Sequence, residues 1–312
     1  GLQGIPLNQT GDNLYFGLAG TNELAEREVI PFFALEQEGM LEYELSRVVN
    51  TLAQAEKPKV GIISGLPING GTTPYSQEPA PAWMVLEQMQ QMFEVQPLQH
   101  DVDQIPDDIG VLLLVHPKSL TEAALYAVDQ FVLRGGKLLA FVDPYAESDQ
   151  AMEAMIEGMA DGKSSDLGPL LKAWGVQYNP EQVVVDERQG MSVSRGQGQL
   201  PARHIGWLEV EPAQIDREDT ITAPLQLLTV GTGGALIPVD GAQTHFTPLL
   251  TSTADSMLMS SEAFANLRDP EDLLKGFKAD EHTYTFAARL EGPAKSAYPQ
   301  GMEGHESGLP QA

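Results

Sequence analysis

The central part of the chain alternates short apolar segments with segments whose apolar residues recur at helical spacing. The short segments are rich in Val, Ile and Leu, which is typical of strands buried in a sheet. We expect strands at 59–64, 95–98, 110–115, 137–142 and 182–185, and helices at 82–93, 121–133 and 167–174. Strands and helices that alternate at this spacing favour an open parallel sheet with helices on both faces.

The segment 121–133 shows the helical pattern most clearly. Ser119 or Thr121 can cap its first turn, and a pair of glycines ends it. Its apolar residues form one stripe, which predicts a face directed at the core. The predicted fold class is therefore α/β, with an open, mostly parallel, doubly wound sheet of the flavodoxin type over residues 57–186.

The N-terminal part contains too few elements for a complete domain. Strands are expected at 14–18 and 28–33 around a polar turn at 21–23, which gives a hairpin. A helix with apolar residues at helical spacing follows and ends before Pro58. One hairpin and one helix cannot enclose a core, so residues 1–56 are predicted to form a partial α/β unit.

Beyond Asp186 the pattern changes to short β-prone segments separated by Gly and Pro. We expect strands at 192–195, 225–230, 244–250 and 283–290, with weaker candidates at 205–210 and 235–238. One short helix is expected at 270–276. Residues 187–292 are predicted to be a β-rich elaboration packed on the core, and 293–312 a flexible polar tail with little to bury.

Charge and composition narrow the functional class. The chain of 312 residues carries 44 Asp and Glu against 18 Lys and Arg, a net charge of −26. This acidity argues against a nucleic acid or an anionic membrane surface as partner. The absence of Cys excludes thiol nucleophiles, thiolate metal sites and disulfides. No apolar stretch reaches the roughly 20 residues that a membrane-spanning helix needs.

Three polar loops are expected to meet at one edge of the predicted sheet. In doubly wound sheets, ligands bind beyond the carboxyl ends of the strands, where the winding direction reverses. The loops that should meet there are 64–71, 116–118 and 143–145. The candidate residues for binding a ligand or partner are Ser64, Gly65, Asn69, His116, Lys118, Asp143 and Tyr145.

Ser64, His116 and Asp143 could supply the hydroxyl, imidazole and carboxylate of a catalytic triad. However, Ser64 lacks the G-x-S-x-G elbow, and a long loop follows it instead of a helix N-terminus. His116 precedes Pro117 and is expected to cap a strand end or to face solvent. We therefore expect binding rather than catalysis. A hydrolase or carbohydrate-active enzyme that uses these residues or acidic pairs is the alternative.

No metal or cofactor is predicted. The six His are scattered, without a pair at i, i+4 spacing and without an H-E-x-x-H motif. The glycines of 65–71 lack the Lys-Ser/Thr of a phosphate-binding loop.

The sequence offers two other candidate binding surfaces. The Met-rich run at 152–159 is either an amphipathic surface helix or a flap, and such faces can bind partners. A polysaccharide-binding module would need aromatic side chains aligned on one exposed face. Only three Trp are present, and Trp83 and Trp174 lie on the expected core faces of helices, which leaves Trp207.

Several sequence blocks together resemble one family. They include DNLYFGLAGTN at 12–22, VIPFF at 29–33, LEYEL at 41–45, KPKVGIISGL at 57–66, VHPK at 115–118, LYAVDQFVLRGGKLLAFVDP at 125–144, LLKAWGV at 170–176, FTPLL at 246–250 and GPAKSAYP at 292–299. The chain resembles the GldG-like family, auxiliary components of ABC-type transport systems associated with gliding motility. The VHPK and DQFVLRGGK…FVDP blocks are the most specific part of the resemblance.

The resemblance implies an extracytoplasmic (periplasmic) domain of an inner-membrane protein that works beside ATPase and permease subunits. The family's flanking membrane helices are not in this sequence, and its thioredoxin-like segment would continue into residues 1–33, so the chain is expected to start within a domain. The middle part is similar to amidotransferase-like folds, whose nucleophilic Cys is missing here. The family supplies no catalytic residues. A non-catalytic domain that binds partner proteins, a small ligand or a polysaccharide, and supports transport or gliding motility, is therefore expected.

Overall fold

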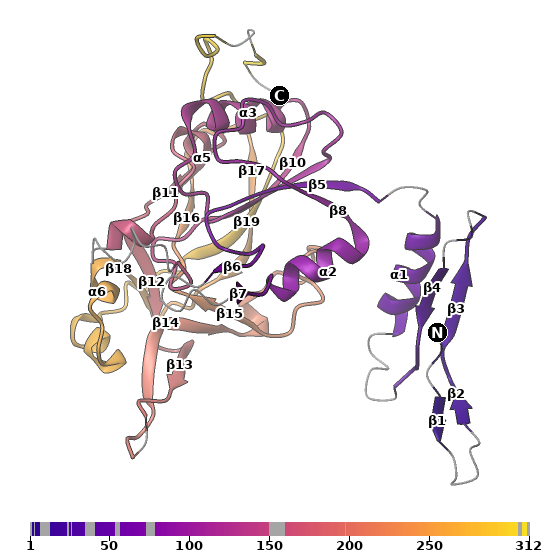
Figure 1. Ribbon diagram of the computed structural model, residues 1–312. Coiled ribbons are helices and arrows are strands. Elements are labelled where there is room, and N and C mark those ends of the chain that lie inside the picture. Colours follow the sequence, from indigo (N-terminus) through magenta and orange to yellow (C-terminus); the bar gives the residue numbers. More distant parts are fainter. Residues whose placement is uncertain are drawn as a thin grey trace. The chain divides into compact units, whose positions relative to one another are not determined.

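The computed structural model describes residues 2, 4–6, 13–23, 25, 27–34, 41–53, 57–72, 79–149, 160–196, 198–304 and 308–310 (Figure 1). The chain divides into two compact units: a smaller one of residues 1–59 and 87–95, and a larger one of 60–86 and 96–312. The Met-rich run at 152–159 lies outside the described residues. Among the residues that are described, no helix has the length and apolar character to cross a membrane.

The smaller unit contains a β-hairpin and a helix, as the sequence predicts. Its elements are β1 (Gly4–Pro6), β2 (Asn13–Tyr15), β3 (Leu18–Thr21), β4 (Arg27–Ile30) and α1 (Leu41–Ala53). A Cβ atom added to Gly20 would lie 2.5 Å from Leu52 Cδ1, so this glycine lets the hairpin approach α1 closely. Arg47 of α1 forms an ion pair with Glu28 of β4 at 3.2 Å.

The first strand of this hairpin starts at Leu18 rather than at the predicted Leu14. Residues 13–15 pair instead with β1. A Cβ atom added to Gly17 would lie 2.4 Å from the Ile30 carbonyl oxygen, so the chain breaks its strand at this close backbone approach. The hairpin itself, β3 with β4, is antiparallel.

The predicted parallel sheet is present. It has the order β10-β9-β5-β8, from β5 (Lys59–Ser64), β8 (Glu94–Pro97), β9 (Val111–Val115) and β10 (Lys137–Phe141). β9 pairs in parallel with both β5 and β10. The accompanying helices are α2 (Met84–Met92) and α3 (Glu122–Leu133). The protein is thus a mixed α/β protein, whereas the doubly wound, flavodoxin-type arrangement stays a prediction.

α3 packs its apolar stripe on this sheet. Val128 and Phe131 are buried together with Leu112 and Leu114 of β9 in the largest core cluster. Thr121 caps the helix by accepting a hydrogen bond from the Ala124 amide at 3.2 Å. In α2, Leu86 is buried, but the prediction of a core position for Trp83 is wrong, because that side chain is 36% exposed.

The remainder of the larger unit is rich in antiparallel strands, as predicted. One sheet has the order β11-β16-β19-β17, a second pairs β12 with β18, and a third has the order β13-β14-β15. Their bounds are β11 (Val176–Tyr178), β12 (Gln182–Asp186), β13 (Gly190–Val193), β14 (Ala202–Val210), β15 (Leu228–Gly231), β16 (Leu236–Pro238), β17 (His245–Thr251), β18 (Ser256–Ser260) and β19 (Thr285–Glu291).

One strand joins a different sheet from the one expected. The sequence predicts 182–185 as a further strand of the parallel sheet, but β12 pairs antiparallel with β18. Val183, Val184 and Val185 are completely buried, as an apolar run predicts. The run fixes burial of this strand but carries no information about its partner, which follows about seventy residues later.

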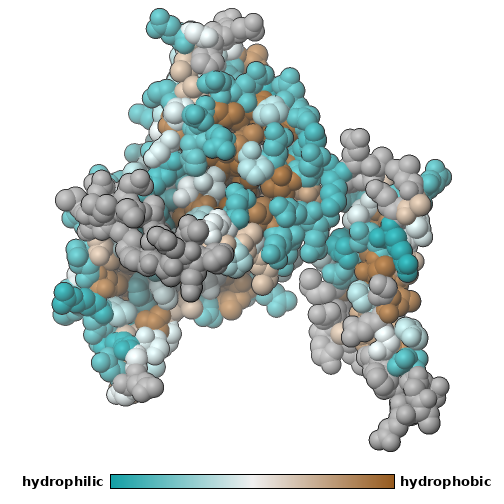
Figure 2. All heavy atoms as spheres, in the orientation of Figure 1, coloured by the Kyte–Doolittle hydropathy of each residue, from teal (hydrophilic) through white to brown (hydrophobic). Residues whose placement is uncertain are grey.

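Short elements complete the larger unit. They are β6 (Gly71–Thr72), β7 (Pro79–Ala80), α5 (Pro169–Ala173), α6 (Glu262–Ala265) and the 3₁₀ helices η2 (Ala160–Lys163), η3 (Pro212–Gln214) and η4 (Pro270–Gly276). The helix predicted at 270–276 is thus a 3₁₀ helix, and Asp269 caps it by accepting from the Glu271 amide at 3.1 Å. Hydrophilic residues occupy most of the visible face of the larger unit (Figure 2).

The C-terminal residues contact α3 through two of its polar side chains. Asp129 is completely buried and accepts hydrogen bonds from Ser296 Oγ at 2.6 Å and the Ala297 amide at 3.2 Å. The Gln130 side chain donates to the Leu309 carbonyl oxygen at 3.1 Å and accepts from the Leu309 amide at 2.6 Å. Hydrogen bonds thus hold parts of 293–310 against this helix.

Candidate functional site

The ends of three parallel strands stand side by side at one edge of the sheet. Ser64, the last residue of β5, is in register with Val115 of β9, which is in register with Phe141 of β10. The chain leaves all three strands at this edge. The structure therefore brings together the loops that begin after these residues, and we call the region the sheet-edge site.

The β5 loop lies directly against the β9 loop. A Cβ atom added to Gly65 would lie 2.3 Å from the His116 carbonyl oxygen, so only glycine allows this approach. The Ser64 hydroxyl donates to the Leu66 carbonyl oxygen at 2.8 Å and accepts from the Leu66 amide at 3.1 Å. Asn69 is exposed, and no hydrogen bond or ion pair within the described residues joins it to the other candidates.

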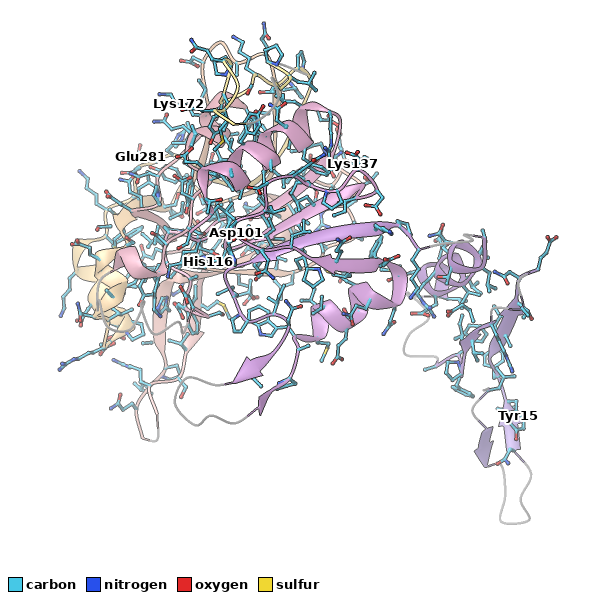
Figure 3. All side chains as sticks on the ribbon, turned by 45° about the horizontal axis from the view of Figure 1, so that its top comes forward. Tyr15, Asp101, His116, Lys137, Lys172 and Glu281 are labelled. Atoms are coloured by element: carbon cyan, nitrogen blue, oxygen red, sulfur yellow. The ribbon has the colours of Figure 1, made fainter. Side chains whose placement is uncertain are left out.

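His116 lies inside the larger unit (Figure 3) and is completely buried, so the expectation that it could face solvent is wrong. Its Nε2 atom lies 3.4 Å from Asp149 Oδ2, and its Nδ1 atom lies 4.0 Å from Asp143 Oδ2. Neither ring nitrogen has a hydrogen bond of acceptable geometry with a described residue. Burial lowers the pKa of His116 and outweighs the opposite effect of Asp149, so the ring is neutral at pH 7.

Lys118 fixes the loop beneath this histidine. Its Nζ atom donates to Asp149 Oδ2 at 2.9 Å and to the Gly162 carbonyl oxygen. Asp149 is 2% exposed, so the ion pair is almost completely removed from water on the carboxylate side. Sequence reasoning missed Asp149, which was one of several carboxylates after β10 with no feature that distinguished it.

Asp143 is a carboxylate of the sheet-edge site that water can reach. Its side chain is 32% exposed, and burial of the remainder raises its pKa to about 6. Its backbone amide donates to Ser165 Oγ at 3.0 Å, and this hydrogen bond holds the loop after β10. At pH 7 the carboxylate is mostly ionised, and near pH 6 it exchanges a proton.

A tyrosine that sequence reasoning missed lies beside this loop. A Cβ atom added to Gly234 would lie 2.7 Å from Tyr178 Cε2 and 3.4 Å from Pro144 Cδ, so the three residues meet. The Tyr178 hydroxyl is buried without a hydrogen-bond partner in the described residues. Burial and the charges of Asp143 and Asp166 raise its pKa. Nothing in the sequence near Tyr178 indicated this position.

Tyr145 contacts residues outside the candidate set. Its ring packs with Phe264, with ring centroids 6.2 Å apart, and the Lys163 ammonium lies 5.1 Å from its ring centroid. Its carbonyl oxygen accepts a hydrogen bond from Thr232 Oγ1 at 2.6 Å. Tyr145 thus anchors the loop after β10 on the antiparallel part of the unit.

The geometry gives no support to the triad hypothesis. The Ser64 hydroxyl is bonded to its own loop, and the described residues contain no hydrogen bond from Ser64 to His116 or from His116 to Asp143. No group of three or more His, Asp or Glu in the described part of the chain could hold a metal ion. The site consists of polar and charged side chains on loops that hydrogen bonds and an ion pair hold in place.

These features define a mixed α/β protein with a large antiparallel part and a polar site at the edge of its parallel sheet. The family model of the ABC-type uncharacterized transport system matches residues 57–311, which is more than three quarters of the chain. The chain therefore belongs to this family of auxiliary components of ABC transport systems. No curated protein sequence and no solved structure matches the chain.

Proposed function

We propose that this chain is a non-catalytic, extracytoplasmic domain of a membrane protein and that its sheet-edge site binds a partner subunit of the transporter. The family membership supports a role beside ATPase and permease subunits. The blocks shared with GldG-like proteins support an extracytoplasmic position and a link to gliding motility. A small ligand at the same site is the second occupant that we consider.

One observation carries the choice of site. Around the partly exposed Asp143, the His116 ring and the Tyr178 hydroxyl are buried without hydrogen-bond partners in the described residues. Buried polar groups in folded proteins nearly always have partners, and the exceptions concentrate where a further molecule binds or a proton moves. Because no triad geometry accompanies these groups, binding explains them better than catalysis.

The test is co-purification of the full-length membrane protein with the ATPase and permease subunits. We expect Asp143→Arg to lower the recovered subunits by about tenfold or more, because it places a cation where the site has a carboxylate that solvent reaches. Asp107→Arg is the matched control, since Asp107 is exposed and lies before β9, at the opposite edge of the same sheet.

Two outcomes contradict the proposal. The first is that neither subunit co-purifies with the unchanged protein. The second is that Asp143→Arg and Asp107→Arg recover equal amounts of the subunits. Asp143→Asn, which keeps the side-chain shape, separates loss of binding from loss of folding, and a thermal melt of each variant confirms that it is folded.

A further inference from the structure

A polar depression lies on the antiparallel part of the larger unit, and it shares no lining residue with the sheet-edge site. Its volume is about 690 Å³, which is within the range of pockets that hold small ligands. We call it the hairpin groove, because it lies along the β13–β14 hairpin beside η4. Its lining residues are Val193, Ser194, Arg195, Gln199, His204, Trp207, Arg268, Asp269 and Pro270.

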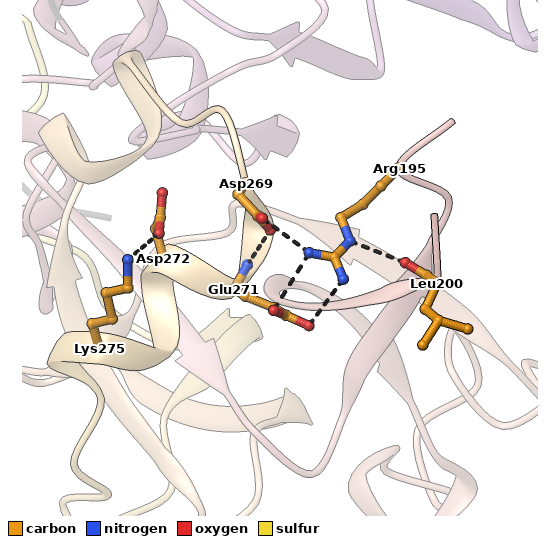
Figure 4. A network of polar contacts seen from close by, with 6 residues as sticks. All are labelled: Arg195, Leu200, Asp269, Glu271, Asp272 and Lys275. Atoms are coloured by element: carbon orange, nitrogen blue, oxygen red, sulfur yellow. Dashed lines mark hydrogen bonds and ion pairs between the residues drawn. The ribbon is translucent and has the colours of Figure 1, made fainter. Parts of the chain in front are cut away.

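An arginine fixes the two walls of the hairpin groove to each other (Figure 4). Arg195 donates to Asp269 Oδ2 at 2.9 Å and to both carboxylate oxygens of Glu271 at 3.4 Å. Its Nε atom donates to the Leu200 carbonyl oxygen at 3.0 Å. The guanidinium thus ties the hairpin to the start of η4, so the depression is a feature of the fold.

The floor of the groove carries a fixed aromatic surface. The Trp207 and His204 rings lie 4.9 Å apart at an interplanar angle of 31°. Trp207 Nε1 donates to Glu147 Oε1 at 2.6 Å, which sets the orientation of the indole. A Cβ atom added to Gly206 would lie 2.5 Å from the Phe264 ring, so glycine here lets β14 bend against that ring.

The hairpin wall of the groove differs in charge from the chain as a whole. The segment from Arg188 to Leu208 contains three Arg and no Asp or Glu, in a chain with a net charge of −26. Arg268, on the opposite wall, is exposed and has no hydrogen bond or ion pair with a described residue. The charge of Arg195 is already matched by Asp269 and Glu271, so Arg268 is the unmatched cation of the lining.

We propose that the hairpin groove binds a carbohydrate chain that contains an acidic sugar. A sugar ring has an apolar C–H face, which can stack on the Trp207 indole, and a rim of hydroxyl groups. Ser194, Gln199 and Asp269 supply both donors and acceptors for such a rim. Arg268 supplies a forked donor for the sugar carboxylate. A peptide fits less well, since Val193 and Pro270 are the aliphatic lining and form no deep apolar pocket.

The test uses the full chain and four named probes: the neutral cellotriose and chitotriose, and the acidic trigalacturonate and a hyaluronan hexasaccharide. Binding is followed by calorimetry and by Trp fluorescence.

We expect an acidic probe to bind, and Trp207→Ala to weaken binding by about tenfold or more. Trp207→Phe should retain part of the affinity, which shows that loss in the Ala variant is not loss of folding. Trp83→Ala is the control, since Trp83 is partly exposed but lies outside the groove.

Arg268→Gln tests recognition of the sugar carboxylate separately from stacking of the sugar on Trp207. It should weaken binding of the acidic probes by about fivefold or more and leave any binding of neutral probes unchanged. The proposal is overturned if none of the probes and no sugar on a glycan array binds the unchanged protein, or if Trp207→Ala binds as tightly as Trp83→Ala. Equal affinity for neutral and acidic probes overturns the assignment of Arg268. Co-purification of the transporter subunits should not change in Trp207→Ala, so this result is independent of the function proposed above.

Discussion

The sheet-edge site and the hairpin groove use their polar groups in opposite ways. At the sheet edge, His116 and Asp149 are buried, and the charge of Asp149 is matched by Lys118 within the site. At the groove, Arg268 and Gln199 are exposed, and the matched ion pairs lie in the walls rather than at the open surface. The first arrangement buries most of its charges in a frame that is costly to disturb and leaves Asp143 partly exposed, whereas the second places its polar groups at the open surface.

Because the charges are buried at one site and exposed at the other, they should contribute differently to the stability of the fold. A buried charge that loses its partner destabilises the fold strongly, because the remaining charge has no water around it. An exposed charge is solvated whether or not a partner is present, so its removal costs little stability. Substitution of a buried charge at the sheet-edge site should therefore change the free energy of unfolding strongly. Substitution of an exposed charge at the hairpin groove should change it little and act mainly on binding.

The largest effect is expected for Lys118→Met. This change removes the ammonium group that neutralises the buried Asp149 carboxylate, and we expect a loss of about 3 kcal/mol in the free energy of unfolding, measured by urea denaturation at pH 7. The control at the groove, Arg268→Met, should leave the urea midpoint unchanged within error.

A double substitution sharpens this test. Lys118→Met combined with Asp149→Asn removes the charge of the buried carboxylate as well, and should recover about half of the lost stability or more. Equal losses for Lys118→Met and Arg268→Met would show that the two sites do not differ as described.

An intermediate effect is expected for Arg195→Met. The guanidinium is 22% exposed and contacts two carboxylates and one carbonyl oxygen, so we expect a loss of about 1 kcal/mol in the free energy of unfolding. The matched control is Lys275→Met, because Lys275 forms an exposed ion pair with Asp272 and both residues lie in η4. Lys275→Met should leave the melting temperature unchanged. If it lowers the melting temperature as much as Arg195→Met does, the clamp between hairpin and η4 has no special role.

The two sites also differ in how far the sequence could predict them. The sheet-edge loops could be expected to meet, because apolar runs at 59–64, 110–115 and 137–142 indicate parallel strands whose ends share an edge. The burial of His116 could not be expected, since it depends on the loop after β10 folding back so that Asp149 lies beneath the ring. A local pattern specifies that a residue ends a strand, but not what later covers it.

The hairpin groove could not be predicted as a unit. Its lining comes from 193–207 and 268–270, which are distant in the sequence and meet only because β14 packs on η4. The one available signal was Trp207, the Trp outside the expected core faces, in a segment without acidic residues. The hydrogen bonds of 296–309 to Asp129 and Gln130 were equally beyond local patterns, because they join residues more than 160 positions apart.

The smallest expected effect is the pH dependence that Asp143 gives to stability. Its pKa in the folded protein is raised to about 6 from an ordinary value of 3.8, so the folded state binds the proton more tightly than the unfolded state. Its favourable contribution is therefore complete below pH 3.8 and is lost as the pH rises through 6. Asp143→Asn removes the ionised form, and we expect it to stabilise the protein by about 1 kcal/mol at pH 7, a value reduced because the side chain is 32% exposed.

Buried His116 contributes with the opposite sign, because its lowered pKa makes stability fall as the pH drops below 6.5. The measurement is therefore the difference in melting temperature between Asp143→Asn and the unchanged protein from pH 4 to 8, in which the contribution of His116 largely cancels. This difference should grow with rising pH and level off above pH 7. A difference that stays constant over this range would mean that Asp143 titrates like an exposed carboxylate. The sheet-edge site would then resemble the hairpin groove in its exposure to water, and the contrast between the two sites would not hold.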